Sequence, residues 1–93
     1  MAQIKRKYPG KKDTEIFHAV HKVMERIAVK MSLSYEKDDA RRSGKVSKMG
    51  ITGVYQVKGE EVVVEMKYPM LIPGSMRQKV EEDISSKLDA LFS

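Results

Sequence analysis

Apolar and polar residues alternate along residues 50–68, GITGVYQVKGEEVVVEMKY, which is the pattern of two β-strands joined by a tight turn. A two-residue turn at Lys58-Gly59 predicts an antiparallel hairpin, because Gly59 can adopt a positive φ. The predicted cross-strand pairs are Val57 with Glu60, Tyr55 with Val62, Gly53 with Val64, and Ile51 with Met66. One face of this hairpin is apolar and carries Ile51, Tyr55, Val57, Val62, Val64 and Met66. We therefore expect an antiparallel sheet with one buried face and one face in water.

Three further segments predict strands. Residues 3–8 alternate up to Pro9-Gly10, residues 32–36 alternate around Leu33 and Tyr35, and residues 42–47 form a polar strand. Turns are expected at residues 38–41 and near Lys48-Met49. The simplest registers place Leu33 opposite Val46, Tyr35 opposite Gly44, and Gly44 opposite Gly53. Tyr35 would then cover a strand glycine. The two glycines would leave a dent in the buried face, either for close approach of a helix or as the floor of a small apolar pocket.

Two segments have the periodicity of amphipathic helices. The first is expected to begin at Asp13 as its N-cap and to run for about 18 residues, with an apolar stripe of Ile16, Phe17, Val20, Val23, Met24, Ile27 and Met31. The second follows a capping box of Ser75 and Gln78, runs to about Leu91, and has a stripe of Met76, Val80, Ile84, Leu88 and Leu91. Asp83 and Lys87 are spaced as an ion pair on its surface. The order β-α-β-β-β-β-α predicts a single α+β domain over residues 1–93, a two-layer sandwich with an antiparallel sheet of about five strands and two helices on one face.

Composition sets limits on the class of protein. The 93 residues include no cysteine, which excludes a disulfide framework and thiolate metal ligands. No stretch approaches the roughly 18 apolar residues of a transmembrane helix, and the first twelve residues lack the apolar run of a signal peptide. We expect a cytoplasmic protein without a transmembrane segment.

The net charge of +5 comes from two basic blocks that alternate with two acidic ones. Residues 1–12 and residues 41–59 each carry five bases and no acid, whereas residues 13–40 and 60–93 have net charges of −2 and −3. The basic candidates for binding nucleic acid or another anionic surface are Lys5, Arg6, Lys7, Lys11, Lys12, Arg41, Arg42, Lys45 and Lys48. Alternatively, these bases pair with acids of the same fold, such as Lys5 and Lys7 with Glu61 and Glu65.

A metal or catalytic site has little support in the sequence. His18, His21 and Glu25 are spaced to share one side of the first helix, where two imidazoles and a carboxylate could ligate zinc. Helical spacing often produces such a trio on a solvated face, and we expect both histidines to be exposed. The chain has no cysteine nucleophile and no phosphate-binding glycine loop. We therefore expect no enzyme activity, no metal and no cofactor.

An apolar loop follows the hairpin. Residues 68–74, YPMLIPG, are bracketed by prolines and are not expected to form a strand. Met70, Leu71 and Ile72 would either fill the open end of the core or, together with Met76, form an exposed contact patch for a partner, a hydrophobic surface or a second subunit.

The pattern of residues resembles one known family. Gly53, Tyr55 and Val57, then Val62, Val64 and Met66, the short apolar loop, and the helix with Val80, Glu81, Ile84, Leu88 and Leu91 resemble the putative polyhydroxyalkanoic acid system proteins. The helix over residues 13–31 is also similar to theirs. The resemblance implies a small bacterial cytoplasmic accessory protein associated with storage-polyester granules, and it implies no catalytic residues.

The sequence thus leaves three functions open. The first is a non-enzymatic accessory protein that contacts a granule or a protein partner through Met70, Leu71, Ile72 and Met76. The second is a nucleic-acid or anionic-surface binding module. The third is a carrier of a small apolar ligand at Gly44 and Gly53, by analogy with small helix-grip folds.

Overall fold

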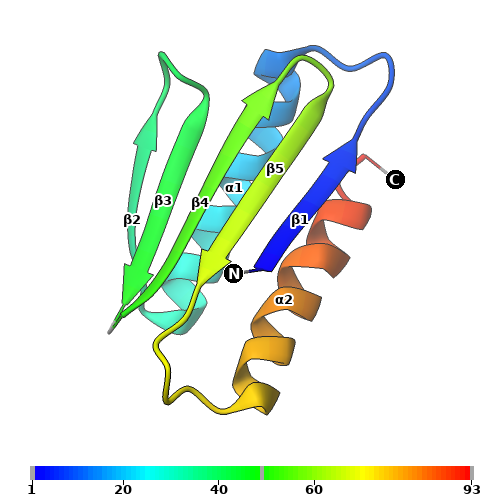
Figure 1. Cartoon of the computed structure of the whole chain (residues 1–93). Coiled ribbons are helices and arrows are strands. Elements are labelled where there is room, and N and C mark those ends of the chain that lie inside the picture. The colour runs from blue at the N-terminus through cyan, green and yellow to red at the C-terminus, as the bar shows by residue number, and fades with distance from the viewer. Residues whose placement is uncertain (1, 49, 93) are drawn as a thin grey trace.

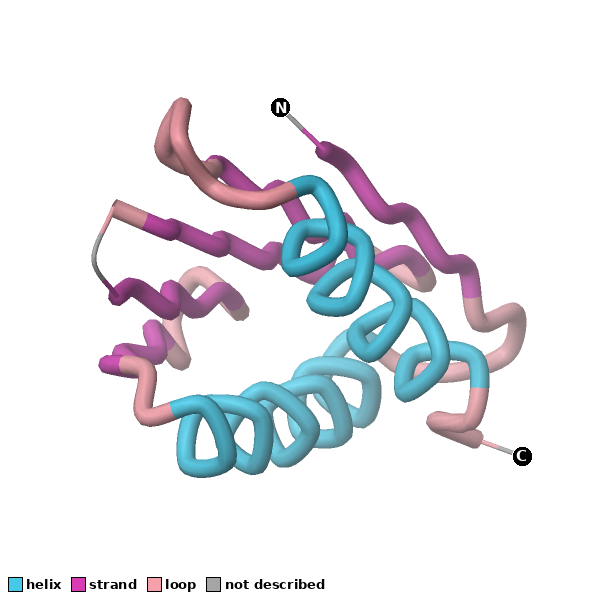
Figure 2. Tube along the Cα trace, turned by 90° about the horizontal axis from the view of Figure 1, so that it is seen from below, coloured by secondary structure: helices cyan, strands magenta, loops and turns pink. Residues whose placement is uncertain are grey.

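The structure is a computed structural model that describes residues 2–48 and 50–92. Its elements are β1 (Ala2–Lys7), α1 (Asp13–Met31), β2 (Ser34–Asp38), β3 (Ser43–Lys48), β4 (Ile51–Lys58), β5 (Glu61–Lys67) and α2 (Gly74–Asp89). The five strands form one antiparallel sheet in the order β1-β5-β4-β3-β2. Both helices lie on the same side of this sheet (Figures 1 and 2). The predicted α+β fold and element order are therefore confirmed.

The faces of the strands are those predicted, but every predicted register is wrong by two residues. In the β4–β5 hairpin Val57 pairs with Val62 and Tyr55 with Val64, because the turn uses Gly59-Glu60 and not Lys58-Gly59. Gly59 is the first of the two turn residues, and its φ of 60° is the positive value that a type II′ turn requires at that position. A shift of two residues leaves each side chain on its own face, so the apolar pattern is satisfied equally well by either register.

The same shift separates the two glycines. Gly44 pairs with Tyr55, and Gly53 pairs with Met66 on one side and Val46 on the other, so Gly44 does not face Gly53. Tyr35 pairs with Val46 and not with Gly44. The predicted turn near Lys48-Met49 falls partly on Met49, which lies outside the described residues.

Large side chains occupy the space above both glycines. A Cβ on Gly44 would lie 2.7 Å from Cζ of Tyr55, and a Cβ on Gly53 would lie 2.5 Å from Sδ of Met66. The aromatic cover over Gly44 therefore comes from Tyr55 and not, as predicted, from Tyr35. The dent expected at Gly44 and Gly53 is filled by these side chains, so the predicted pocket floor is not open to a ligand from the buried face.

Both helices begin differently from the prediction. Helix α1 starts at Asp13 with Lys12 as the N-cap, and the Asp13 carboxylate forms an ion pair of 3.2 Å with Arg42. Helix α2 starts at Gly74 after Pro73, so Ser75 lies in its first turn and is not a cap. The Gln78 amide accordingly donates to Glu82, at 3.0 Å, and does not close a capping box. The predicted pair of Asp83 and Lys87 is present, at 3.2 Å.

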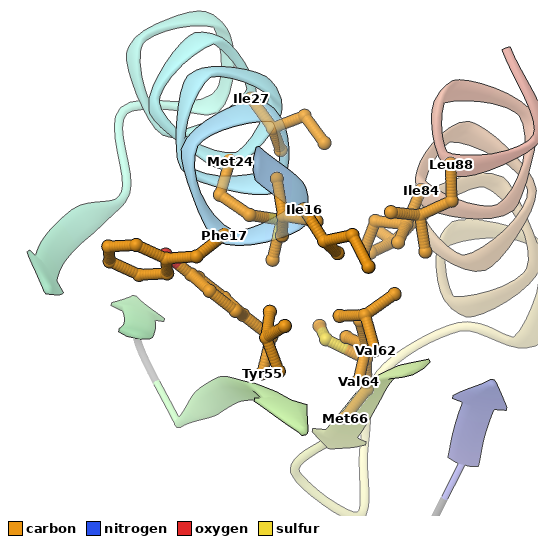
Figure 3. Packing of buried hydrophobic residues seen from close by; sticks show 13 residues of the cluster. Ile16, Phe17, Met24, Ile27, Tyr55, Val62, Val64, Met66, Ile84 and Leu88 are labelled. Carbon is orange, nitrogen blue, oxygen red and sulfur yellow. The ribbon is translucent and has the colours of Figure 1, made fainter. Parts of the chain in front are cut away.

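The core lies between the sheet and the two helices (Figure 3). Helix α1 contributes Ile16, Phe17, Val20, Met24 and Ile27, helix α2 contributes Val80, Ile84 and Leu88, and the sheet contributes Tyr55, Val57, Val62, Val64 and Met66. Complete burial of such side chains is the main favourable term for folding, at about 1.5–3 kcal/mol each. The core therefore holds the sheet and the two helices together.

Candidate functional site

Among the described residues, the two large apolar side chains with the greatest exposed fraction lie in the loop between β5 and α2. Met70 is 97% exposed, Leu71 is 96% exposed, and Met76 in the first turn of α2 is 49% exposed. Ile72 is half-buried. Met70 and Leu71 therefore do not fill the end of the core, and the structure places the predicted contact residues at one end of the molecule, on the lower side of Figure 1.

The loop holds these side chains outward because its flanks are fastened. The Tyr68 hydroxyl donates to Glu81 of α2 at 3.2 Å, and the Arg77 guanidinium lies over the Tyr68 ring. Pro69 packs against Gly50 at the β3–β4 turn, and the Ile72 amide donates to the Pro69 carbonyl at 3.2 Å. Since both ends of the loop are fixed, Met70 and Leu71 project from a turn of restricted conformation.

Burial raises the pKa of Tyr68 to about 12, and the nearby Glu81 carboxylate acts in the same direction. The proton on Tyr68 is therefore retained at neutral pH, and it makes the hydrogen bond that joins the loop to α2. This bond is one of the fixed points on which the position of Met70 and Leu71 depends.

A pocket of about 410 Å³ lies behind the loop. Its walls come from the end of α1, the segment before β2, the start of β4, the loop, and the first turn of α2. Every lining residue except Lys48 is apolar. We use the name apolar end for this surface, which comprises Met31, Leu33, Ile51, Pro69, Met70, Leu71, Ile72 and Met76.

The chain segments that build the apolar end carry only positive charge. Residues 29–34, 47–52 and 66–80 contain five bases and no acid. These bases, which we call the basic rim, are Lys30, Lys48, Lys67, Arg77 and Lys79. The rim is joined to the apolar end by contact, because the Lys48 ammonium donates to the Met31 carbonyl at 3.1 Å. Glu81, which is hydrogen-bonded to Tyr68, and Glu82 and Asp83, which line a pocket with Lys30 and Lys79, lie at the α2 side of this rim, so positive charge predominates at the apolar end without being continuous. An apolar patch with a mainly positive rim favours partners that are both apolar and anionic.

The other predicted anion-binding residues are not brought together. Arg6 lies on the helix side of β1, where it forms a 2.6 Å ion pair with Asp89 and a hydrogen bond with Ser85. Arg42 pairs with Asp13, and Arg41 lies 3.8 Å from Asp38. Three of the nine candidates are thus matched with acids of the same fold, and Lys48 belongs to the basic rim. Of the others, Lys11 lies over the Phe92 ring, and Lys12 is the N-cap residue of α1.

Lys5, Lys7 and Lys45 lie on the outer face of the sheet, the face opposite the helices. Strand alternation places five lysines and four acids there among the described residues, namely Lys5, Lys7, Lys45, Lys58 and Lys67 with Glu36, Asp38, Glu61 and Glu65. Lys45 pairs across strands with Glu36, and Glu61 lies between Lys7 and Lys58. Alternating charges of this kind stabilise a sheet face, and they are unlike the continuous positive track that phosphates favour.

A hydrogen-bonded chain of side chains joins α1 to the sheet. The Tyr55 and Tyr35 hydroxyls are 2.6 Å apart, the Tyr35 hydroxyl is 2.8 Å from His21 Nδ1, and His21 Nε2 is 3.7 Å from Glu25. If Tyr55 donates to Tyr35 and Tyr35 donates to Nδ1, every hydroxyl proton has an acceptor. Burial raises the pKa of both tyrosines, which keeps them protonated.

This chain corrects one prediction about α1. His21 is half-buried and stacks with Phe17 and Tyr35, so it is not on the exposed side of the helix, whereas His18 is. Within residues 2–48 and 50–92, no three His, Cys, Asp or Glu side chains gather as a metal site. His21 therefore has a structural role in holding β2 and β4 against α1.

Part of the apolar end was missed by reasoning from sequence. The sequence pattern places Met31, Leu33 and Ile51 on strand and helix faces. Four bases of the rim are absent from the predicted anion-binding residues, namely Lys30, Lys67, Arg77 and Lys79. The available signal was the absence of acids in three segments that an antiparallel order brings to the same end of the sheet. Charge counts over consecutive blocks of sequence did not reveal it, because the three segments lie in different blocks.

Comparison with protein-family models, with curated proteins and with solved structures found no match to this chain. No helix in the described part of the chain combines the length and the apolar character needed to cross a membrane.

Proposed function

We propose that this protein is a non-enzymatic accessory protein that associates with an anionic surface that has an apolar interior, through its apolar end and basic rim. The observation that carries the proposal is the almost complete exposure of Met70 and Leu71 at an apolar end whose chain segments carry five bases. The resemblance to polyhydroxyalkanoic acid system proteins makes a bacterial storage-polyester granule in the cytoplasm the proposed surface.

The apolar contribution is large enough to matter. Transfer of one Met or Leu side chain from water to an apolar phase is favourable by about 1.5–3 kcal/mol, so Met70 and Leu71 together contribute about 3–6 kcal/mol. The fixed flanks of the loop reduce the conformational entropy that is lost when these side chains insert. Insertion of these two residues alone would therefore give weak, reversible association.

The basic rim supplies the second contribution. A Lys or Arg close to an anionic lipid surface contributes about 1 kcal/mol, and five such residues add about 5 kcal/mol. The sum of roughly 8–11 kcal/mol is an upper limit, equivalent to dissociation constants between about 1 μM and about 10 nM, and the cost of association weakens the affinity from there. Neither contribution is sufficient alone, which makes binding selective for surfaces that are both apolar inside and negatively charged.

The proposal is tested by sedimentation of the purified protein with storage-polyester particles, with phosphatidylglycerol vesicles, and with single-stranded RNA. We expect the protein to sediment with the particles and the vesicles, and the Leu71→Asp variant to stay in solution with an unchanged melting temperature. Binding to RNA without binding to the particles or the vesicles would reject this proposal in favour of a nucleic-acid binding function. Unfolding of Leu71→Asp would mean that the loop belongs to the core and would remove the contact patch.

A further inference from the structure

The pocket behind the loop has the composition of a site for an amphiphile. Its volume of about 410 Å³ lies within the range of roughly 300–1,000 Å³ that is usual for small-molecule sites. Met31, Leu33 and Ile51 are apolar parts of its wall, and Lys48 is its one charged residue. A pocket that is apolar apart from one positive charge matches a ligand that is apolar apart from one negative charge.

We propose that this pocket binds a single long acyl chain whose acidic head group pairs with Lys48. This inference rests on the proposed surface association, which brings the protein to a source of such chains. The Lys48 ammonium uses one of its three donors on the Met31 carbonyl at 3.1 Å, so two donors remain for a carboxylate or a phosphate. The carbonyl contact also fixes the ammonium at the pocket, where a charge-assisted hydrogen bond to an anion is strong.

A second pocket indicates in which direction the bound acyl chain runs. It has a volume of about 560 Å³, and it shares Met31 and Met76 with the first pocket. Methionine side chains are flexible and adapt to irregular apolar ligands, so movement of Met31 and Met76 would join the two spaces. Glu82 and Asp83 line the second pocket together with Lys30 and Lys79. The two bases and two acids of this lining cancel in charge, whereas Lys48 is the one charged residue that lines the first pocket, so the acidic head group belongs at Lys48 and the methyl end points toward α2.

The ligand class is tested with dodecanoate, used as monomers below its micelle concentration, and followed by methyl NMR spectra of the full chain. We expect saturable shifts at the methyl groups of Met31, Leu33 and Ile51, and dodecanol, which lacks the charge, to bind roughly ten-fold more weakly. Lys48→Gln retains a donor for the Met31 carbonyl and should weaken dodecanoate binding roughly ten-fold. The matched control is Lys67→Gln, which removes an equal charge from the basic rim outside the pocket and should change binding less than two-fold.

Met70→Asp separates the inference from the proposed function, because Met70 belongs to the exposed patch but does not line the pocket. We expect this variant to lose vesicle binding and to keep dodecanoate binding. Absence of shifts at the pocket methyl groups, or equal losses in Lys48→Gln and Lys67→Gln, would overturn the acyl-chain site whatever the outcome with vesicles. Vesicle binding without dodecanoate binding would leave the proposed function in place and reject the pocket.

Discussion

The ring of Tyr55 in β4 lies directly over Gly44 in β3 and fills the space in which any larger residue would place a side chain. Tyr55 is completely buried, and Phe17 of α1 packs beside its ring (Figure 3). The pair therefore joins a small residue to a large one at the centre of the sheet. This complementarity selects one register among those that the apolar pattern permits.

Replacement of Gly44 by alanine is expected to destabilise the fold. The new Cβ would lie 2.7 Å from Cζ of Tyr55, and such overpacking of a core costs about 1–3 kcal/mol. The free energy of unfolding, measured by urea denaturation, should fall by that amount. Gly74→Ala at the start of α2 is the control, because its Cβ would meet no atom within 4 Å, and its stability should change by less than about 1 kcal/mol. Equal stability of Gly44→Ala and wild type would contradict the packing described.

The Tyr35 hydroxyl is expected to contribute to stability through Tyr55. Tyr35→Phe would leave the buried Tyr55 hydroxyl without an acceptor, which costs about 1–3 kcal/mol. In a Tyr55→Phe background that penalty disappears, so the same Tyr35→Phe change should cost less. A double-mutant cycle measures this coupling. If the two changes were simply additive, the hydrogen bond between the two hydroxyls would have no energetic role.

Stability should fall at alkaline pH because the folded state holds its tyrosine protons more tightly than the unfolded chain. Burial raises the pKa of Tyr68 from 10.0 to about 12. A raised pKa contributes stability that is fully present below pH 10 and is lost as the pH rises toward 12. Urea denaturation across this interval should show a decline that is smaller in Tyr68→Phe. Equal declines in the two proteins, or tyrosinate absorbance that rises at the unfolded pKa for every tyrosine, would contradict the buried environment of Tyr68.

The identity and faces of the strands were predictable, whereas their registers were not. A period of two fixes which side chains are buried, and a slip by two residues preserves it. The prediction placed Gly44 opposite Gly53, which would have left an unfilled dent. The observed register sets each glycine against a large side chain, Tyr55 or Met66, and this packing between strands is not visible in the pattern of any single strand.

The helix starts and the contact loop were likewise only partly predictable from the sequence. The apolar stripes predicted both helices, but they did not predict the caps. Asp13 pairs with Arg42, which is distant in the sequence, and Pro73 is the N-cap of α2 in place of Ser75. The loop at Met70 and Leu71 was predicted as an apolar loop, yet its exposure depends on Tyr68 and Pro69, which contact other elements. The sequence pattern therefore located the loop, and tertiary contacts determine its exposure.

The basic rim is expected to strengthen vesicle binding because its bases lie next to the apolar end, and not merely because they add to the net charge of the protein. Lys30→Gln with Lys79→Gln should weaken binding to phosphatidylglycerol vesicles by roughly thirty-fold, at about 1 kcal/mol for each residue. Lys5→Gln with Lys7→Gln removes the same charge from the outer face of the sheet and should weaken binding less than about three-fold. Vesicle flotation at several salt concentrations measures both variants. Equal effects of the two pairs would show that only net charge matters.

The most direct test of the apolar end is the affinity for phosphatidylglycerol vesicles when Met70 and Leu71 are both replaced by aspartate. Loss of about 3–6 kcal/mol of transfer free energy predicts a fall in affinity of at least one hundred-fold, with the free energy of unfolding unchanged because both side chains are exposed. Val54→Asp, which places a charge on a partly exposed apolar position of the outer sheet face, is the control and should change the affinity less than about three-fold. If the double variant bound as tightly as wild type, or no more weakly than Val54→Asp, the apolar end would not be the contact surface.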